Sequence, residues 1–139
     1  MEKKQITALA FHLPLKQKAA AYGARIMEEL HSDNAVALLN ASFLFIYELR
    51  HFESDLLQMK NIQHKYPWLK LIAAEKSFNQ KHLDKLLINK VSGYLVIESD
   101  LDDLDKIIHE VLNGHYCFSR NTLMGIKQTL TTNLTTQIT

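Results

Sequence analysis

The sequence predicts an α/β fold, in which a doubly wound parallel sheet of four or five strands carries helices on both faces. Three observations favour it. A length of 139 residues suits one hydrophobic core. Short apolar runs of strand length alternate along the chain with amphipathic helical stretches. The run at 43–47 is unbroken by polar residues, which is typical of a parallel strand buried on both faces.

The first expected strand and helix lie near the start of the chain. Residues 6–11 form a compact apolar run, which Pro14 closes. Apolar side chains then recur every three or four residues as far as residue 30, and this period predicts one long helix. A competing interpretation shortens the helix and makes residues 24–30 a strand. Because the period favours the helix, we expect a short helical or irregular segment at 33–40 and one strand fewer than usual.

Strands and helices alternate more clearly in the rest of the chain. The expected strands are residues 43–47, 69–74 and 94–97. Ser54 can cap the helix after the first of these, and Pro67 ends it. Ser99 and Asp102 have the spacing of a capping box for a later helix, which Asn113-Gly114 closes.

Composition and charge exclude several classes of protein. With 47% hydrophobic and 22% charged residues, four Gly and two Pro, the chain is neither disordered nor collagen-like. A net charge of +1 supplies no basic surface for nucleic acid. The longest apolar stretch, residues 35–47, is too short to span a bilayer, and the single Cys117 fits a reducing compartment. We expect a cytoplasmic domain without membrane contact.

Several segments resemble the receiver domains of LuxR/NarL-type response regulators. They are the run Lys-Val-Ser-Gly-Tyr-Leu-Val-Ile at 90–97, the helix ending Val-Leu-Asn-Gly, the exit at 116–119, the passage 66–72, and Glu-Leu-Arg at 48–50. The resemblance implies a receiver or flavodoxin-like three-layer sandwich with an extra C-terminal helix. Residues 1–120 would be the receiver-like domain. Residues 121–139 would be a helix and a Thr-rich linker toward a helix-turn-helix domain absent from this chain.

The resemblance also implies a site, and this sequence departs from it. A working receiver holds Mg²⁺ with carboxylates, accepts phosphate on an aspartate, senses it with a hydroxyl and neutralises it with a lysine. Phe11 and His12 stand where two acidic residues are expected. Glu75 replaces the sensing hydroxyl, with Ser77 nearby, and Ile97 replaces the lysine. We expect a degenerate receiver that is not phosphorylated and holds neither metal nor other cofactor.

The phosphoacceptor position itself has two candidates. The local match gives Glu48, whereas a gap-free alignment to the following helix gives Tyr47. Glu48 could act as a fixed negative charge that imitates the modified state. It could equally be a solvated carboxylate at a strand end, and this second interpretation is favoured because charged side chains are usually exposed.

The exit segment suggests an alternative function. Residues 111–120 are similar to the receiver exit of biofilm and curli regulators in this family, some of which bind cyclic di-GMP there. Phe118, Ser119 and Arg120 match the last three positions of their binding motif. Cys117 replaces the aromatic residue that would stack on guanine, which removes most of the stacking energy. We keep three alternatives to a non-catalytic regulatory domain. They are a cyclic dinucleotide sensor, a genuine phosphoreceiver and a stand-alone adaptor.

No residue pattern indicates an enzyme or a metal site. The seven histidines include no pair at the spacing of a zinc helix. We expect instead a non-catalytic regulatory domain that acts by protein–protein contact and dimerises through its last two helices and fifth strand. The resemblance points to Asp103, Lys106 and His109 as the dimer surface. DNA would be bound only by the absent C-terminal domain, at a half-site spacing that the dimer sets.

Overall fold

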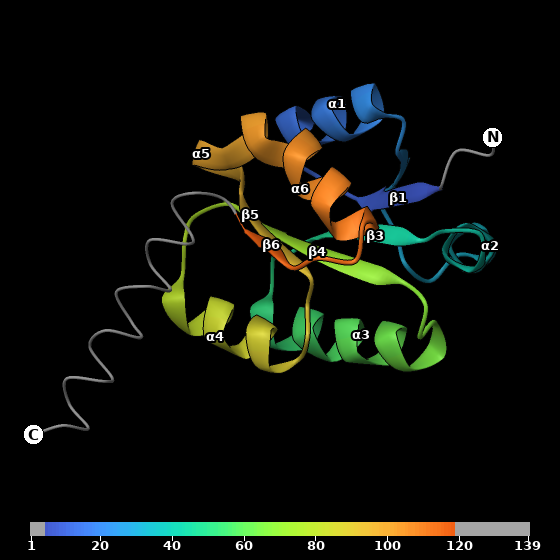
Figure 1. The fold of residues 1–139 in the computed structure, drawn as a ribbon. Helices are drawn as coiled ribbons and strands as arrows, with labels where there is room; N and C mark the ends of the chain where they lie inside the picture. Colours follow the sequence, from blue (N-terminus) through green and yellow to red (C-terminus); the bar gives the residue numbers. More distant parts are fainter. Residues whose placement is uncertain (1–4, 119–139) are drawn as a thin grey trace, which may run out of the picture.

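Six parallel strands form the central sheet, in the order β2-β1-β3-β4-β5-β6 (Figure 1). The computed structural model describes residues 5–118. The strands are β1 (Ile6–Leu9), β2 (Arg25–Met27), β3 (Leu44–Glu48), β4 (Lys70–Glu75), β5 (Gly93–Val96) and β6 (Cys117–Phe118). Every neighbouring pair is parallel. The predicted doubly wound α/β fold is confirmed, but with six strands in the described part of the chain rather than four or five.

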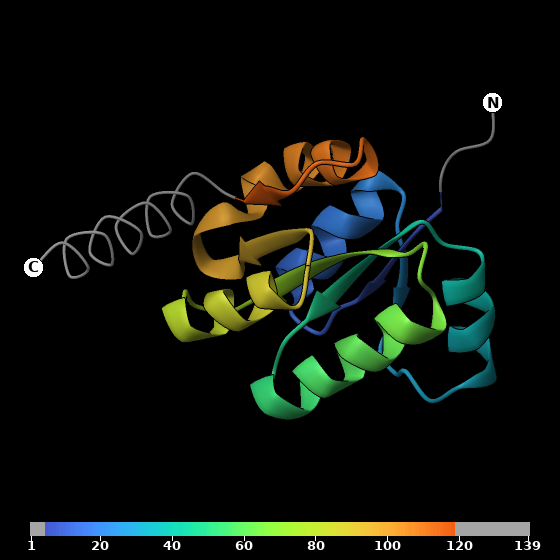
Figure 2. The ribbon, with the colours of Figure 1, turned by 60° about the horizontal axis from the view of Figure 1, so that its bottom comes forward.

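Helices cover both faces of the sheet (Figure 2). They are α1 (Leu13–Tyr22), α2 (Asp33–Asn40), α3 (Phe52–Lys65), α4 (Gln80–Ile88), α5 (Ile97–Asp100), the 3-10 turn η1 (Leu101–Asp103) and α6 (Leu104–Leu112). Helices α1 and α6 pack on one face, and α2, α3 and α4 pack on the other. Within residues 5–118, no helix is both long and apolar enough to cross a membrane.

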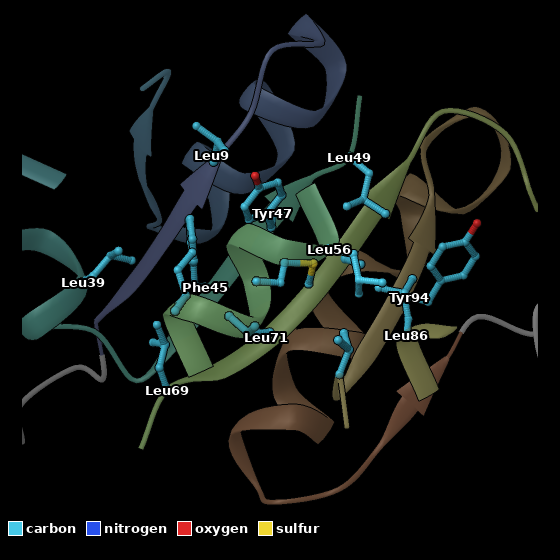
Figure 3. Packing of buried hydrophobic residues seen from close by; sticks show 14 of the residues in the cluster. Leu9, Leu39, Phe45, Tyr47, Leu49, Leu56, Leu69, Leu71, Leu86 and Tyr94 are labelled. Atoms are coloured by element: carbon cyan, nitrogen blue, oxygen red, sulfur yellow. The ribbon is translucent and has the colours of Figure 1, made fainter. Parts of the chain in front are cut away.

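Alternate side chains of each central strand enter the two layers of the core. In β3, Phe45 and Tyr47 pack toward α3, whereas Leu44 and Ile46 pack toward α1 and α6. Figure 3 shows the first of these layers, which includes Phe45 and Tyr47 of β3 and Leu56 of α3. All five residues of β3 are buried. This double burial explains why residues 44–47 of β3 are an unbroken apolar run.

The long first helix predicted from apolar spacing is wrong. Helix α1 ends at Tyr22, because Gly23 adopts a left-handed conformation with φ 108° and donates its N–H to the last turn. Residues 25–27 then form β2, so the competing interpretation of a strand within 24–30 is confirmed. This strand is short and lies at the sheet edge, so its burial is only partial and no unbroken apolar run marks it. The helical segment predicted at 33–40 is confirmed as α2.

Two predicted helix starts are also wrong. Ser99 does not begin a helix, because the chain passes from β5 directly into α5. There the buried Asp100 carboxylate accepts a hydrogen bond from the backbone N–H of Val96 at 3.1 Å. At the start of α3, Asp55 rather than Ser54 accepts the free backbone N–H groups. The glycine closure at Gly114 is confirmed, with φ 88°.

Lys90 occupies a backbone conformation that suits glycine. It follows the C-cap of α4 with φ 60°, the only positive φ of a non-glycine residue in the described range. Its N–H donates to Leu87 O, and the N–H of Val91 donates to Leu86 O. This pair of bonds is a Schellman motif, whose left-handed position is usually glycine or asparagine. A lysine there costs about 1 kcal/mol of backbone strain.

We expect Lys90→Gly to raise the free energy of unfolding by about 1 kcal/mol, because glycine relieves the left-handed strain. Urea unfolding followed by circular dichroism measures the change. Lys90→Ala is the matched control, since it removes the same charge but keeps the Cβ atom and should give no such gain. Equal stability of both variants would contradict the strain.

Candidate functional site

The carboxyl edge of the sheet is where ligands bind in open α/β folds. Three of the polar side chains there come from the ends of β3 and β4 and from the loop after β1: Glu48, Glu75 and His12. The register of β1 with β3 pairs Leu9 with Tyr47, so the loop after β1 lies directly beside Glu48.

Glu48 is not a solvated carboxylate, and the interpretation favoured from the sequence is wrong. Glu48 is 1% exposed. Its Oε1 accepts the backbone N–H groups of Phe11 at 2.9 Å and His12 at 3.0 Å, and its Oε2 lies 2.7 Å from His12 Nδ1. The physical reason is that the N–H groups at the start of α1 lack helical partners and carry the positive end of the helix dipole. A carboxylate on the neighbouring strand satisfies them.

The groups around Glu48 do not fit the magnesium ion that the receiver fold implies. A cation needs oxygen acceptors, but Phe11 and His12 present backbone N–H donors to the carboxylate. Glu48 already uses both of its oxygens on these donors and on the imidazole. Within the described residues, no three His, Cys, Asp or Glu side chains are grouped to hold a metal. This edge therefore surrounds the Glu48 carboxylate with hydrogen-bond donors, whereas a working receiver offers acceptors to a cation here.

Tyr47 points into the core on the α3 side rather than to the β1–α1 loop. Its phenol donates to Asp55 Oδ1 at 2.8 Å. Asp55 Oδ2 in turn accepts the backbone N–H groups of Arg50 and His51, both at 2.8 Å. Burial, and then the hydrogen bond to Asp55, raise the pKa of the Tyr47 phenol well above its ordinary value. The structure thus places Glu48, and not Tyr47, against the loop after β1.

Glu75 forms a second pair of a carboxylate with a histidine, at the end of β4. Its Oε1 accepts from the phenol of Tyr94 at 2.6 Å, and its Oε2 lies 2.6 Å from His82 Nδ1. The His82 ring stacks on Phe52 with 3.8 Å between ring centres. Tyr94 is fully buried, and burial followed by Glu75 raises the pKa of its phenol far above the usual range. Strands β4 and β5 are thereby joined to α4 at this edge.

The positions of the sensing hydroxyl and the lysine carry other groups. Ser77 is exposed, and its hydroxyl donates to Glu98 Oε2 at 3.1 Å. Ile97 is 7% exposed and packs in the core between the sheet and helices α1 and α6. An apolar side chain at this point offers no charge to a phosphoryl group.

Phe11 is covered by a cation that the sequence analysis missed. The guanidinium of Arg50 lies 3.5 Å from the centre of the Phe11 ring. Both residues line a cavity of about 270 Å³, together with His31 and His51. Arg50, Asp55, His82 and Tyr94 are the residues that sequence reasoning did not select. The signal that could have identified them is their position: Arg50, Asp55 and His82 follow a strand end by two to seven residues, and Tyr94 lies on the neighbouring strand.

The remaining predicted site residues lie away from this edge. Lys106 and His109 are exposed on α6, and Asp103, the last residue of η1 and the N-cap of α6, is half-buried; all three lie outside the apolar stripe as predicted. Phe118 is partly buried against the core, whereas Ser119 and Arg120 lie outside the described residues. The C-terminal helix and linker expected at 121–139 also lie outside them. Burial raises the pKa of the Cys117 thiol, and His115 pairs with Glu110 rather than with this thiol.

Comparisons with known proteins support the fold. No family model and no curated protein matches the chain. The isolated receiver domain of RcsB from Salmonella enterica serovar Typhimurium, solved with the phosphomimetic BeF₃⁻, is 14% identical with a TM-score of 0.69. The match covers 86% of this chain and 95% of that one.

Two other solved structures are similar. A LuxR family DNA-binding response regulator from Silicibacter pomeroyi is 13% identical over 86% of this chain and 99% of its own, with a TM-score of 0.67. The CheY-like protein TadZ from Pseudomonas aeruginosa PAO1 is 16% identical over 77% of this chain and 98% of its own, with a TM-score of 0.60. At these identities the likeness establishes that the chain has the receiver fold.

We expect Glu48→Gln to lower the free energy of unfolding by about 2–4 kcal/mol. The amide cannot accept from all three donors, and the His12 imidazole loses its charged partner. Chemical denaturation at neutral pH measures the loss. Glu53→Gln is the matched control, because Glu53 is an exposed residue that pairs with Lys85, and its change should leave stability unaltered. Equal losses in the two variants would contradict the buried role of Glu48.

Two of the five tyrosines should resist ionisation until the domain unfolds. Since the folded-state pKa values of Tyr47 and Tyr94 are raised, their stabilising contribution is complete below the unfolded value of about 10 and declines as the pH rises above it. Phenolate absorbance and unfolding free energy, measured along an alkaline titration, check this. Tyr94→Phe should remove one late-titrating phenol, and simultaneous titration of all five in the folded protein would contradict it.

Proposed function

We propose that this chain is a degenerate receiver domain of a LuxR-type transcription regulator, non-catalytic and independent of phosphorylation. It acts in signal transduction by protein–protein contact and dimerisation. The observation that carries this proposal is the buried Glu48 carboxylate, which is held by two backbone N–H groups and an imidazole.

Phosphoryl transfer to this edge would lack the groups that normally stabilise it. The charge that develops during transfer is normally offset by a metal and a cationic side chain. Here the groups beside Glu48 are hydrogen-bond donors, and Ile97 is apolar. An incoming phosphate would also meet the charge of Glu48 itself. These features support a domain that neither receives nor tolerates a phosphoryl group.

Glu48 instead supplies a permanent negative charge at the end of β3. In this proposal the charge takes the place of the phosphoryl group and holds the β1–α1 loop in one arrangement. Because the carboxylate is buried and fully hydrogen-bonded, no reaction is needed to create it or remove it. Regulation would then come from the amount of protein and from its partners.

Dimerisation is proposed to use the exposed face of α6. Lys106 and His109 on this face, with Asp103 at the N-cap of the helix, bring both signs of charge together, so two copies related by a twofold axis can pair opposite charges. DNA would be contacted by a separate helix-turn-helix domain, with the spacing of two such domains set by the receiver dimer.

Acetyl phosphate with Mg²⁺ should leave the domain unmodified, because the metal ligands and the lysine of a working site are missing. Intact-mass spectrometry detects any phosphoryl adduct, and the RcsB receiver domain treated in parallel serves as the control for reagent activity. Sedimentation of the same samples should show a dimer whose association is unchanged by the reagent. A covalent adduct on Glu48, or a monomer at every concentration, would overturn the proposal.

A further inference from the structure

A cavity of about 370 Å³ lies at the amino edge of the sheet, opposite to the edge that carries Glu48. Its walls come from three loops, those that precede β4, β5 and β6. The residues that matter for its chemistry are Lys70, Lys90, Ser92, His115, Tyr116 and Pro67. Its volume falls within the range of small-molecule sites, about 300–1,000 Å³.

The lining of this cavity is cationic and contains no carboxylate. His115 is balanced by Glu110, whose carboxylate lies 2.9 Å from its ring and has its pKa lowered by that contact. Lys70 and Lys90 make no ion pair with any described residue. Two lysines without an ion-pair partner among the described residues therefore line one cavity. The Ser92 hydroxyl, which makes no hydrogen bond within residues 5–118, adds a donor beside them.

Lys90 carries a second, independent observation. It holds the left-handed conformation with φ 60° that glycine or asparagine would adopt at lower cost. Asn89, a residue type that often adopts this conformation, directly precedes it in the chain, but the left-handed residue is Lys90. Strained residues persist chiefly where a functional geometry requires them. Here the strain places a cation at the wall of the cavity.

We propose that this cavity binds a small organic phosphate. The phosphate would be held by Lys70, Lys90 and the Ser92 hydroxyl, since ammonium and hydroxyl groups are good donors to phosphate oxygens. The Tyr116 ring and Pro67 provide apolar surface for the organic part of the ligand. A nucleic acid is the weaker fit, because a net charge of +1 does not attract an extended polyanion.

The test is a titration of the full chain with glucose 6-phosphate, followed by the NMR shifts of backbone amides at constant ionic strength. Glucose and inorganic phosphate are titrated separately. We expect saturable shifts confined to residues 68–71, 89–93 and 113–116, with weaker binding of inorganic phosphate and none of glucose. Shifts that do not saturate, or that spread over lysines elsewhere, would overturn the proposal.

Two substitutions make the result specific. Lys90→Gly should weaken binding about tenfold, as expected for the loss of one charge-assisted hydrogen bond. Because this variant should be more stable than the parent chain, weaker binding cannot come from unfolding. Lys81→Gln, at the other end of α4, is the matched control and should bind as the parent does. Equal effects of the two substitutions would also overturn the site, and neither result bears on covalent phosphorylation at Glu48.

Discussion

The hydrogen bonds of Glu48 determine what the carboxyl edge of this domain can do. A buried charge is costly unless donors surround it, and here the start of α1 provides them through its unpaired N–H groups. The same contact fixes the end of β3 against the loop after β1. It also uses both carboxylate oxygens of Glu48, so this side chain has no free oxygen for a cation. The contact that holds β3 against the β1–α1 loop is thus the one that occupies the Glu48 carboxylate.

The second carboxylate, Glu75, extends this arrangement across the sheet. It joins Tyr94 of β5 to His82 of α4, so β4, β5 and α4 meet in one hydrogen-bonded group. Both edge carboxylates therefore pair with a histidine and with a group from another element. Such networks are specific when every member is satisfied, because a polar group left unpaired inside a protein is costly. These hydrogen bonds hold the ends of β4 and β5 against α4.

Much of the fold could be predicted from the sequence, because a strand that is buried on both faces has a nearly continuous run of apolar residues. β3 is the clearest case. β2 could not be predicted in this way, since a three-residue edge strand buries too little to leave a pattern, and the apolar spacing of α1 continued past Gly23. The burial of Glu48 could not be predicted from the sequence either. It depends on the β1–β3 register and on donors some 36 residues away in the chain, which no local pattern records.

Gly93 explains how the sheet gains its sixth strand. A Cβ atom at this position would lie 3.0 Å from the carbonyl oxygen of Cys117 and 3.1 Å from Cγ1 of Ile72. A side chain here would force β6 or the neighbouring side chains to shift by a few tenths of an ångström, so glycine suits the close approach of β6 to β5. With β6 (Cys117–Phe118) in place, the first two residues of β5, Gly93 and Tyr94, are paired on their outer side. Because an unpaired strand edge is a template for pairing with other chains, a bulkier residue at Gly93 is expected to expose more of the β5 edge to such pairing.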